Sequence, residues 1–397
     1  MAKSMAGRSV LIITQPPHDG GVPAKTRLLC RYLRERGHRV TVAWYATFGH
    51  DSQLNAPLWR VPGGARPGAR DQLCFDDFSG VAVGCWAPEL EAPYYLPNPV
   101  WRHLIASHDR HIAVGGPPLV GHLLVATGTP GLLWCASDVV ADRQDRVAAM
   151  GPARRLLHDC VTLPWVKRQQ ARVLSGMTRV MGVSRYTTIR LQAHGCPSEH
   201  LSRLPIPVDT QVFTPPVQAA PGPMAGQAGQ TAWVALAALA QLKDRGVAAR
   251  LRLAGARPSA ATLAQVAGLG LEQMVEFVGE LHRDQLPDFY RSLDVFVLPS
   301  HQEGLCIAGL EAMACGVPVV STRCGGPEDY VRHDQTGLLV QADAAAMAEA
   351  LGRVVADRSL RYRLSMQARQ VVEAEFSPAA FAAGLTAAWQ DVWGDRP

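Results

Sequence analysis

Several features that mark metal-stabilised, secreted or membrane-spanning proteins are missing from this chain of 397 residues. Its nine cysteines stand singly, with no pair two residues apart and no cysteine and histidine spacing of the zinc type, which argues against a disulfide or structural-metal framework. No run reaches the roughly 18 apolar residues of a spanning helix. A few polar residues lead directly into the short apolar run 9–13, so no signal peptide is expected. These absences predict a cytoplasmic protein.

A strong excess of one charge sign is missing as well. The chain has 39 lysines and arginines against 34 aspartates and glutamates, a net charge of +5, which is too small to predict a nucleic-acid partner. Hydrophobic residues make up 48% of the chain, enough to bury sheets and to exclude a disordered protein. Because the length exceeds what one ordinary core needs, we expect two α/β domains.

The order of apolar segments predicts where these domains begin and end. A buried strand near residues 9–13, a helical pattern over 23–36 and a strand over 38–45 form a β-α-β unit, the building block of doubly wound sheets. Residues 60–80 are rich in Gly, Pro and Arg and predict an irregular loop. Residues 213–230 contain few bulky side chains and no convincing strand, which predicts a linker. The expected domains are therefore 1–212 and 231–375, followed by a C-terminal helix over 376–397.

The densest chemical signal lies in the second domain. A buried strand is expected to end at Pro299 and Ser300, a loop then carries Glu303, and a helix opens before Glu311. A loop that follows a parallel strand and opens a helix offers unpaired backbone N–H groups and a positive dipole end, so it suits a phosphate. Two glutamates at this spacing are, on their own, more often solvated surface residues than ligand-binding residues. The surrounding sequence has to decide which of these they are.

That surrounding pattern resembles the retaining glycosyltransferases of the family 4 type, the glycosyl transferases group 1, which have the GT-B fold. Glu303 and Glu311 stand with seven residues between them, and EAMACGVPVVST and the segment 325–328 follow in the family's order. The resemblance covers most of residues 8–392 and is weaker over 50–105. It implies an α/β protein of two Rossmann-like domains facing a central cleft, with the acceptor on the N-terminal side, the nucleotide sugar on the C-terminal side, and the last helix packed back toward the N-terminal domain.

The resemblance also implies roles for individual residues. Glu303 would hold hydroxyls of the transferred sugar as a catalytic residue, and Glu311 would bind the ribose diol. Asp138 departs from the family, because it lies in the segment where many relatives carry a histidine, and it is the second catalytic candidate, which would contact the sugar or the acceptor. The remaining donor-binding positions are backbone groups or lie close to the base, and they are Gly20, Gly21, Glu280, Gly304, Leu305, Cys306 and Ile307. For Gly20 and Gly21 an ordinary tight turn is an equally good interpretation.

The chain departs from the family pattern at the diphosphate. The family supplies an arginine and a lysine from the first strand and loop of the second domain, and this chain has neither between Phe213 and Trp233. Arg257, which follows a predicted strand, is the candidate replacement cation. Cys306 stands where relatives often have glycine. The alternative function is therefore a catalytically impaired homologue that acts as a binding or partner subunit.

The expected ligands follow from the same comparison. The resemblance implies a nucleotide sugar as substrate, no cofactor and no obligatory metal, and an acceptor that is a carbohydrate, a lipid-linked sugar or a small molecule, in polysaccharide, glycolipid or glycoside biosynthesis. Arginines and lysines lie near Leu156, Leu157 and Trp165. This mixture predicts either a basic amphipathic surface at the inner face of a membrane or a solvated helix face.

Overall fold

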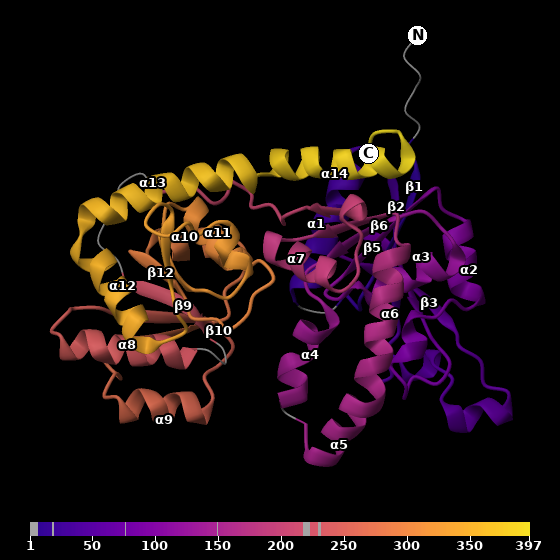
Figure 1. The fold of residues 1–397 in the computed structure, drawn as a ribbon, viewed down its shortest axis with the longest axis horizontal. Helices are drawn as coiled ribbons and strands as arrows, with labels where there is room; N and C mark the ends of the chain where they lie inside the picture. The colour runs from indigo at the N-terminus through magenta and orange to yellow at the C-terminus, as the bar shows by residue number, and fades with distance from the viewer. Residues whose placement is uncertain (1–6, 18–19, 76, 149, 217–222, 229–231) are drawn as a thin grey trace, which may run out of the picture. The chain divides into compact units, whose positions relative to one another are not determined.

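The computed structural model describes residues 7–17, 20–75, 77–148, 150–216, 223–228 and 232–397. Its contacts divide the chain into two α/β units (Figure 1). Unit 1 comprises residues 1–204 together with 383–397, and unit 2 comprises residues 205–382. The sequence placed the boundary at residue 212, eight residues later. Each unit has one central sheet with helices around it, in keeping with two Rossmann-like domains.

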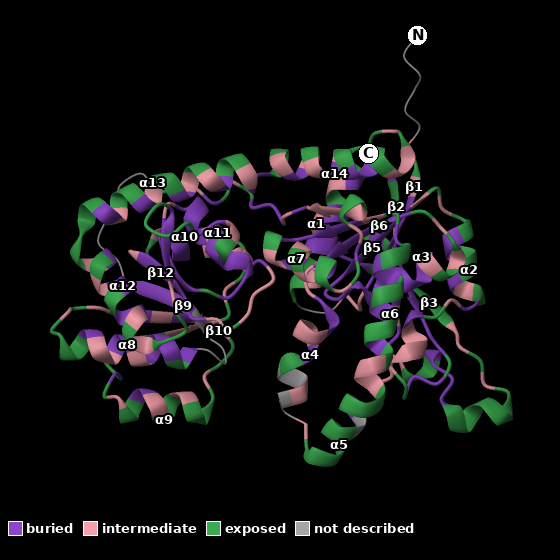
Figure 2. Cartoon of the chain, viewed as in Figure 1, coloured by how far each residue is buried: buried purple, intermediate pink, exposed green. Residues whose placement is uncertain are grey.

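Unit 1 is built on an eight-stranded sheet with the order β3-β4-β2-β1-β5-β6-β7-β8. The strands are β1 (Ser9–Thr14), β2 (Arg39–Tyr45), β3 (Ala69–Cys74), β4 (Phe78–Val83), β5 (Arg110–Gly115), β6 (Leu132–Cys135), β7 (Arg179–Gly182) and β8 (Leu201–Arg203). The pairs are parallel except that between β3 and β4. The apolar run of β1 is buried at the centre of this sheet (Figure 2), as a strand covered on both faces requires.

The helices of unit 1 alternate with its strands at first, and several helical segments then follow one another between β6 and β7. The helices are α1 (Gly21–Glu35), α2 (Pro99–Ala106), α3 (His122–Thr127), α4 (Val139–Ala148), α5 (Pro152–Leu157), a π-helical turn (His158–Thr162), α6 (Leu163–Gly176) and α7 (Arg185–Ala193). Short 3₁₀ turns at Ala92–Tyr95 and Pro118–Gly121 connect other elements. The helix α6 packs on α3 and on the second of these turns, and its Val166, Val173 and Leu174 are buried in the core of the unit.

The prediction of an irregular loop over residues 60–80 is wrong in part, because β3 and the start of β4 lie in this segment and pair in antiparallel fashion. Five of the six residues of β3 are exposed. An edge strand of this kind has no apolar alternation, so its sequence carries little of the usual strand signal.

Unit 2 is built on a six-stranded parallel sheet with the order β11-β10-β9-β12-β13-β14. The strands are β9 (Met224–Ala228), β10 (Leu251–Gly255), β11 (Val275–Gly279), β12 (Val295–Leu298), β13 (Val319–Thr322) and β14 (Gly337–Val340). The helices are α8 (Ala232–Asp244), α9 (Ala260–Gly268), α10 (Leu286–Arg291), α11 (Ile307–Ala314), α12 (Ala344–Ala356) and α13 (Arg358–Glu375). Helices α8 and α12 pack together on one face of the sheet, and α10, α11 and α13 lie on the other (Figure 1). The direction of winding changes between β9 and β12, which places a topological switch point there.

The prediction of a linker over residues 213–230 is also wrong in part. Of the residues described there, Met224–Ala228 form β9, which pairs with β10 on one side and β12 on the other. A Cβ on Gly226 would lie 3.1 Å from the Val297 carbonyl oxygen. The small residues that made this stretch look like a linker are therefore the ones that let a central strand fit between its neighbours.

The C-terminal helix α14 (Pro378–Trp393) begins in unit 2 and ends in unit 1. Its Trp389 packs against His38 with ring centroids 5.4 Å apart, and the Trp389 Nε1–H donates to Asp395 at 2.7 Å. Asp395 also forms an ion pair with Arg110 at 2.6 Å. These contacts hold the end of the chain against β2 and β5 of unit 1.

Candidate functional site: the carboxyl ends of the unit 2 strands

The loop between β12 and α11 lies at the switch point of the unit 2 sheet. It runs from Pro299 to Cys306, and α11 begins at Ile307. Cys306, the N-cap residue, has a φ of 62°, a left-handed conformation that lets the chain turn abruptly into the helix. The first N–H groups of α11 have no carbonyl partner within the helix and lie at the positive end of its dipole. The helix that the sequence predicts to open before Glu311 agrees with this geometry.

The neighbouring segment after β13 holds this loop in place. The Glu303 N–H donates to the Cys324 carbonyl oxygen, and the Gly326 N–H donates to the Glu303 carbonyl oxygen, both at 2.8 Å. A Cβ on Gly326 would lie 2.4 Å from the Gly304 carbonyl oxygen. Position 326 therefore has to be glycine for the loop to approach this closely.

Tyr330 fixes the turn from the loop into α11. Its hydroxyl donates to the Cys306 carbonyl oxygen at 2.9 Å, and a Cβ on Gly309 would lie 2.4 Å from that hydroxyl. Tyr330 is fully buried. The backbone at Gly304, Leu305, Cys306 and Ile307 is thus held from both sides before any ligand binds, which is the preorganisation that a phosphate-binding loop needs.

Glu303 lies in the loop itself. Its Oε1 accepts a hydrogen bond from the Ser300 hydroxyl at 2.9 Å. Burial raises the pKa of Glu303 above its ordinary value, while the bond from Ser300 opposes that shift. A half-buried carboxylate with one fixed hydrogen bond keeps further lone pairs for ligand hydroxyls.

Glu311 lies one turn into α11, and its Oε2 accepts a hydrogen bond from the Tyr290 hydroxyl at 3.0 Å. Burial raises the pKa of Glu311 from 4.5 to about 7, with opposing contributions from the Tyr290 hydrogen bond and the Arg283 charge. Arg283 is exposed in the loop after β11, so that loop brings a cation within electrostatic reach of α11.

The other predicted residues of unit 2 end neighbouring strands. Glu280 is exposed and directly follows Gly279, which has a φ of 81° at the end of β11. Arg257 is exposed after β10, on the rim of a pocket of about 400 Å³ that Trp233 and Phe277 also line. Because the carboxyl ends of parallel strands meet at one edge of a sheet, Glu280, Arg257, Glu303 and Glu311 share this edge.

The three predicted residues of unit 1 lie at the corresponding edge of its own sheet. Gly20, with a φ of 133°, and Gly21 are exposed at the start of α1, while the neighbouring His18 and Asp19 lie outside the described residues. Asp138 is buried. Its Oδ1 accepts the Val140 and Ala141 N–H groups at 2.8 and 3.1 Å, and its Oδ2 pairs with Arg190. Burial opposes ionisation, but the Arg190 hydrogen bond holds the pKa of Asp138 below its ordinary value. This geometry makes Asp138 the cap of α4, so contact with a substrate remains a prediction.

Comparisons with known proteins agree with this arrangement. Residues 221–357 match the family model described as Glycosyl transferases group 1. Over 95% of this chain and 96% of the relative, the sequence is 28% identical to the GDP-mannose-dependent alpha-(1-6)-phosphatidylinositol monomannoside mannosyltransferase of Mycobacterium tuberculosis. The chain is thus similar in sequence to group 1 glycosyltransferases, and it has the GT-B fold.

Solved structures support this fold over nearly the whole length of the chain. Sucrose-phosphate synthase from Thermosynechococcus elongatus aligns over 98% of this chain and 99% of its own, with a TM-score of 0.72 and 20% identity. Anabaena Alr3699/HepE in complex with UDP aligns over 96% of this chain and 99% of its own, with a TM-score of 0.70 and 15% identity.

Several polar residues of the candidate site were not anticipated from the sequence. Tyr290 and Ser300 bind the two glutamates, and Arg283 acts on Glu311 through its charge. Trp233 on α8 and His301 in the loop have ring centroids 6.5 Å apart, so they connect the two sides of the switch point. Most of these contacts join elements that are far apart in the sequence. Only the contact between Ser300 and Glu303 joins residues close enough in sequence for their spacing to have indicated it.

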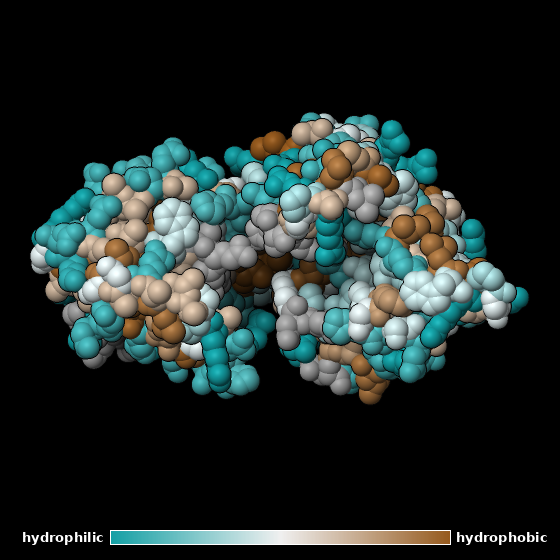
Figure 3. Space-filling model, turned by 90° about the horizontal axis from the view of Figure 1, so that it is seen from below, coloured by the Kyte–Doolittle hydropathy of each residue, from teal (hydrophilic) through white to brown (hydrophobic). Residues whose placement is uncertain are grey.

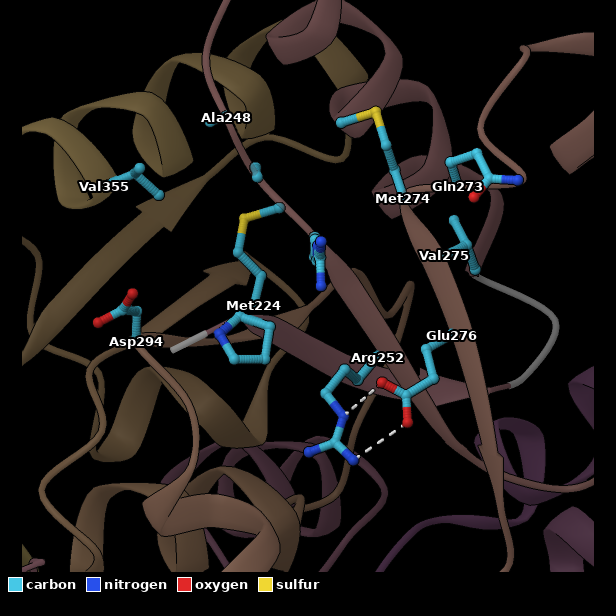
Figure 4. A pocket seen from close by; sticks show the side chains of 12 residues that line it. Met224, Ala248, Arg252, Gln273, Met274, Val275, Glu276, Asp294 and Val355 are labelled. Carbon is cyan, nitrogen blue, oxygen red and sulfur yellow. Dashed lines mark hydrogen bonds and ion pairs between the residues drawn. The ribbon is translucent and has the colours of Figure 1, made fainter. Parts of the chain in front are cut away.

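A further pocket of unit 2 lies at the opposite edge of the sheet. It has a volume of about 830 Å³ and is lined by residues at the starts of β9, β10 and β11 (Figure 4). Arg252 on β10 and Glu276 on β11 are direct neighbours on these paired strands and form an ion pair of 3.0 Å at one side of the pocket (Figure 4). Ligands of doubly wound sheets bind outside the carboxyl ends of the strands, so this amino-terminal pocket is not the donor site.

Among the residues that the structure describes, no cluster of three or more His, Cys, Asp or Glu side chains is placed to hold a metal ion. No helix within the same residues is both long and apolar enough to cross a membrane.

Proposed function

We propose that the protein transfers a sugar from a nucleotide sugar to an acceptor hydroxyl with retention of anomeric configuration and without an obligatory metal. The observation that carries this proposal is the pair Glu303 and Glu311 around the preorganised N-terminus of α11, at the switch point of the unit 2 sheet. A nucleoside diphosphate has the charge and the ribose hydroxyls that these groups complement.

In the proposed reaction, the bond between the anomeric carbon and the diphosphate oxygen breaks and its electron pair goes to the diphosphate. The acceptor oxygen forms the new bond on the same face of the sugar, and its proton passes to the departing diphosphate oxygen. The helix N-terminus stabilises the charge that develops on the leaving group. Glu303 holds hydroxyls of the transferred sugar, and Glu311 accepts hydrogen bonds from the ribose.

Arg257 and Arg283 are the proposed sources of positive charge at the diphosphate. Arg257 lies at the end of β10, and Arg283 acts on Glu311 through its charge. Either arginine can take the place of the pair that the family supplies after its first strand. A binding protein without turnover remains the second candidate, because residues 213–233 contain no arginine or lysine.

The first test is calorimetric titration of the wild type with UDP, GDP and ADP, repeated with Glu311→Gln and with the exposed control Glu349→Gln. We expect one nucleotide to bind the wild type and the control equally, and to bind Glu311→Gln at least about tenfold more weakly, about 1.4 kcal/mol. Absence of nucleotide binding to folded wild type would overturn the proposal.

Turnover then separates an enzyme from a binding subunit. The sugar donors of the nucleotide that binds are incubated with the protein, and the anomeric configuration of the product is read by NMR. Glu303→Gln is expected to keep nucleotide affinity and to lose turnover, because Glu303 contacts the sugar. Tight nucleotide binding without transfer to any acceptor in a broad glycoside panel would favour the binding subunit.

Peripheral contact with an anionic membrane is part of the proposal. On the helices α5 and α6 and the π-helical turn between them, Leu156 is 66% exposed, Val161 59% and Trp165 36%, and Arg154, Arg155, Lys167, Arg168 and Arg172 are exposed nearby. On the face shown in Figure 3, hydrophilic residues cover most of the surface and apolar ones form small separate groups. An apolar tip flanked by basic residues suits a lipid surface.

The membrane contact is tested by sedimentation with phosphatidylcholine vesicles that contain or lack phosphatidylglycerol. Binding that requires the anionic lipid and is lost in Trp165→Ser is the expected result. Equal binding of the wild type and Trp165→Ser would show that these helices have only a solvated face.

A further inference from the structure

Tyr290 supplies a hydrogen bond to the side chain of Glu311 from a neighbouring helix. It lies on α10, which packs against α11. Its hydroxyl donates to the Glu311 Oε2 at 3.0 Å. Tyr290 is only 3% exposed, and a hydrogen bond shielded from water in this way is electrostatically stronger than one at the surface. The contact therefore fixes one oxygen of Glu311 relative to the sheet.

Aromatic rings hold the Tyr290 side chain in place. The rings of Phe289 and Phe296 lie edge-on to it, with centroids 5.7 and 5.6 Å away, and the Phe213 ring lies at 6.1 Å. Phe296 belongs to β12, the strand that leads into the loop of the candidate site. Packed aromatic side chains favour such edge-to-face arrangements. The Tyr290 hydroxyl is therefore directed at Glu311 before any ligand binds.

A carboxylate with one oxygen held in place presents its remaining lone pairs in a defined direction. The two oxygens of a carboxylate have about four acceptor sites between them, and the bond from Tyr290 uses one of those on Glu311. A glutamate side chain without such a partner loses rotamer entropy when it binds a ligand. The contact with Tyr290 reduces that cost, because it orders the side chain in the folded protein. The arrangement suits two neighbouring hydroxyls, such as the ribose diol.

The charges around Glu311 affect which form of its carboxyl group is present. Burial raises the pKa of Glu311 to about 7, and the Tyr290 hydrogen bond and the Arg283 charge oppose this shift. Further ionisable side chains beside α11 come from α10, from the loop before α11, from the two ends of α11 and from α13, and they are Asp288, Arg291, Glu303, Cys306, Cys315 and Arg369. Burial raises the pKa of both thiols, so they are neutral at pH 7. The Tyr290 hydrogen bond favours the ionised form of Glu311, which accepts hydrogen bonds from both ribose hydroxyls.

We propose that Tyr290 is a positioning residue of the donor site: by holding the carboxylate of Glu311, it makes the protein select a ribose over a 2′-deoxyribose in the nucleotide. The proposal rests on the function proposed above, in which Glu311 accepts hydrogen bonds from the ribose, and it specifies how that sugar is selected. Tyr290 acts through Glu311 and does not itself contact the nucleotide.

The test is calorimetric titration at pH 8 with UDP, GDP and ADP and with the 2′-deoxy form of each. The proteins are the wild type, Tyr290→Phe and the control Tyr362→Phe, which removes the hydroxyl of a tyrosine that is 69% exposed on α13. We expect the wild type and the control to bind a ribonucleotide at least about tenfold more tightly than its 2′-deoxy form, because the latter lacks a hydrogen bond to a charged group. In Tyr290→Phe this ratio should fall below about threefold, because the carboxylate is no longer held.

A second readout is the pH dependence of nucleotide affinity. The affinity of the wild type should rise as Glu311 ionises, around pH 7. Tyr290→Phe removes a hydrogen bond that favours the ionised form, so the midpoint of its profile should move to higher pH. The terminal phosphate of the nucleotide also titrates in this region, so the quantity compared is the shift between two proteins with the same nucleotide. Tyr362→Phe should show no shift.

The variant Glu311→Asp provides an independent check, because its shorter side chain keeps a carboxylate but draws it back from Tyr290. It too should lose the preference for ribose. This variant keeps the test valid if thermal unfolding shows that Tyr290→Phe has lost its fold.

Three results would overturn the inference. The wild type could bind a nucleotide with no preference for ribose, Tyr290→Phe could keep the preference of the wild type, or Tyr290→Phe could weaken the ribose and 2′-deoxyribose forms by the same factor, as a purely structural role would. A folded wild type that binds no nucleotide would instead refute the proposed function, and the role of Tyr290 with it.

Discussion

Replacing Glu311 by glutamine should stabilise the protein at pH 8 while weakening its nucleotide site. Burial raises the pKa of Glu311 from 4.5 to about 7. A carboxyl group with a raised pKa binds more protons in the folded state than in the unfolded state between these two values, so stability falls as pH rises from 4.5 to 7. At about 1.36 kcal/mol for each pH unit, this loss amounts to roughly 3 kcal/mol above pH 7.

Glutamine has the same shape, stays neutral at every pH and can still accept the hydrogen bond from Tyr290. Its amide N–H group needs a partner that the carboxylate did not need, which costs about 1 kcal/mol. The expected net effect is therefore a loss of about 1 kcal/mol at pH 4.5 and a gain of about 2 kcal/mol at pH 8, the latter about 4 to 8 °C in melting temperature.

The assay is scanning calorimetry of the ligand-free protein at both pH values, with Glu349→Gln as the exposed control. The transition that belongs to unit 2 is the one that shifts when nucleotide is added. A difference between Glu311→Gln and the wild type that is equal at pH 4.5 and pH 8 would refute the burial argument. If Glu311→Gln is less stable than the wild type at pH 4.5, more stable at pH 8 and weaker in nucleotide binding, the carboxylate at this position lowers stability and serves function.

Two further substitutions test other buried charges. Because burial lowers the pKa of Lys25 to about 7, the unfolded state binds more protons than the folded state from pH 7 up to the ordinary lysine value. The free energy of unfolding of the wild type should therefore rise with pH over that range, and urea unfolding of Lys25→Met should show no such rise. An equal rise in both proteins would contradict the lowered pKa of Lys25. Arg369 donates to three backbone carbonyl oxygens of unit 2 at 2.5 to 2.9 Å. Scanning calorimetry of Arg369→Met should therefore show a free energy of unfolding lower by about 2 to 4 kcal/mol. The control is Arg363→Met, an exposed position on the same helix, which should change this free energy by less than about 0.5 kcal/mol.

The strands that the sequence predicts are those with continuous apolar runs. Residues 10–13 and 295–298 are such runs, and they lie in the strands β1 and β12. The strands β3 and β9 have no such run, for opposite reasons. β3 is an exposed edge with polar side chains, and β9 is a crowded centre in which Gly226 has to be small. The hydrophobic pattern identifies neither strand, because it depends on the size and polarity of each side chain and carries no information about which strands will lie beside it.

The position of the loop between β12 and α11 was predictable from the sequence to the level of the backbone. Its place after a buried strand and before a helix follows from local pattern, and the structure confirms that α11 begins at Ile307 with Glu311 one turn later. The partners of the glutamates come from other parts of the fold, as Tyr290 on α10 does. The sequence could not distinguish whether Asp138 faces a ligand or caps a helix, because both roles use the same carboxylate after the same strand.

The proposal gives Gly326 no role in binding the substrate, yet its missing side chain determines where the loop between β12 and α11 lies. In a library of random substitutions, position 326 should therefore be as intolerant as a catalytic residue, because any added atom would push against Gly304. A tolerated change there would need a compensating change in the loop, so the two positions are expected to evolve as a pair.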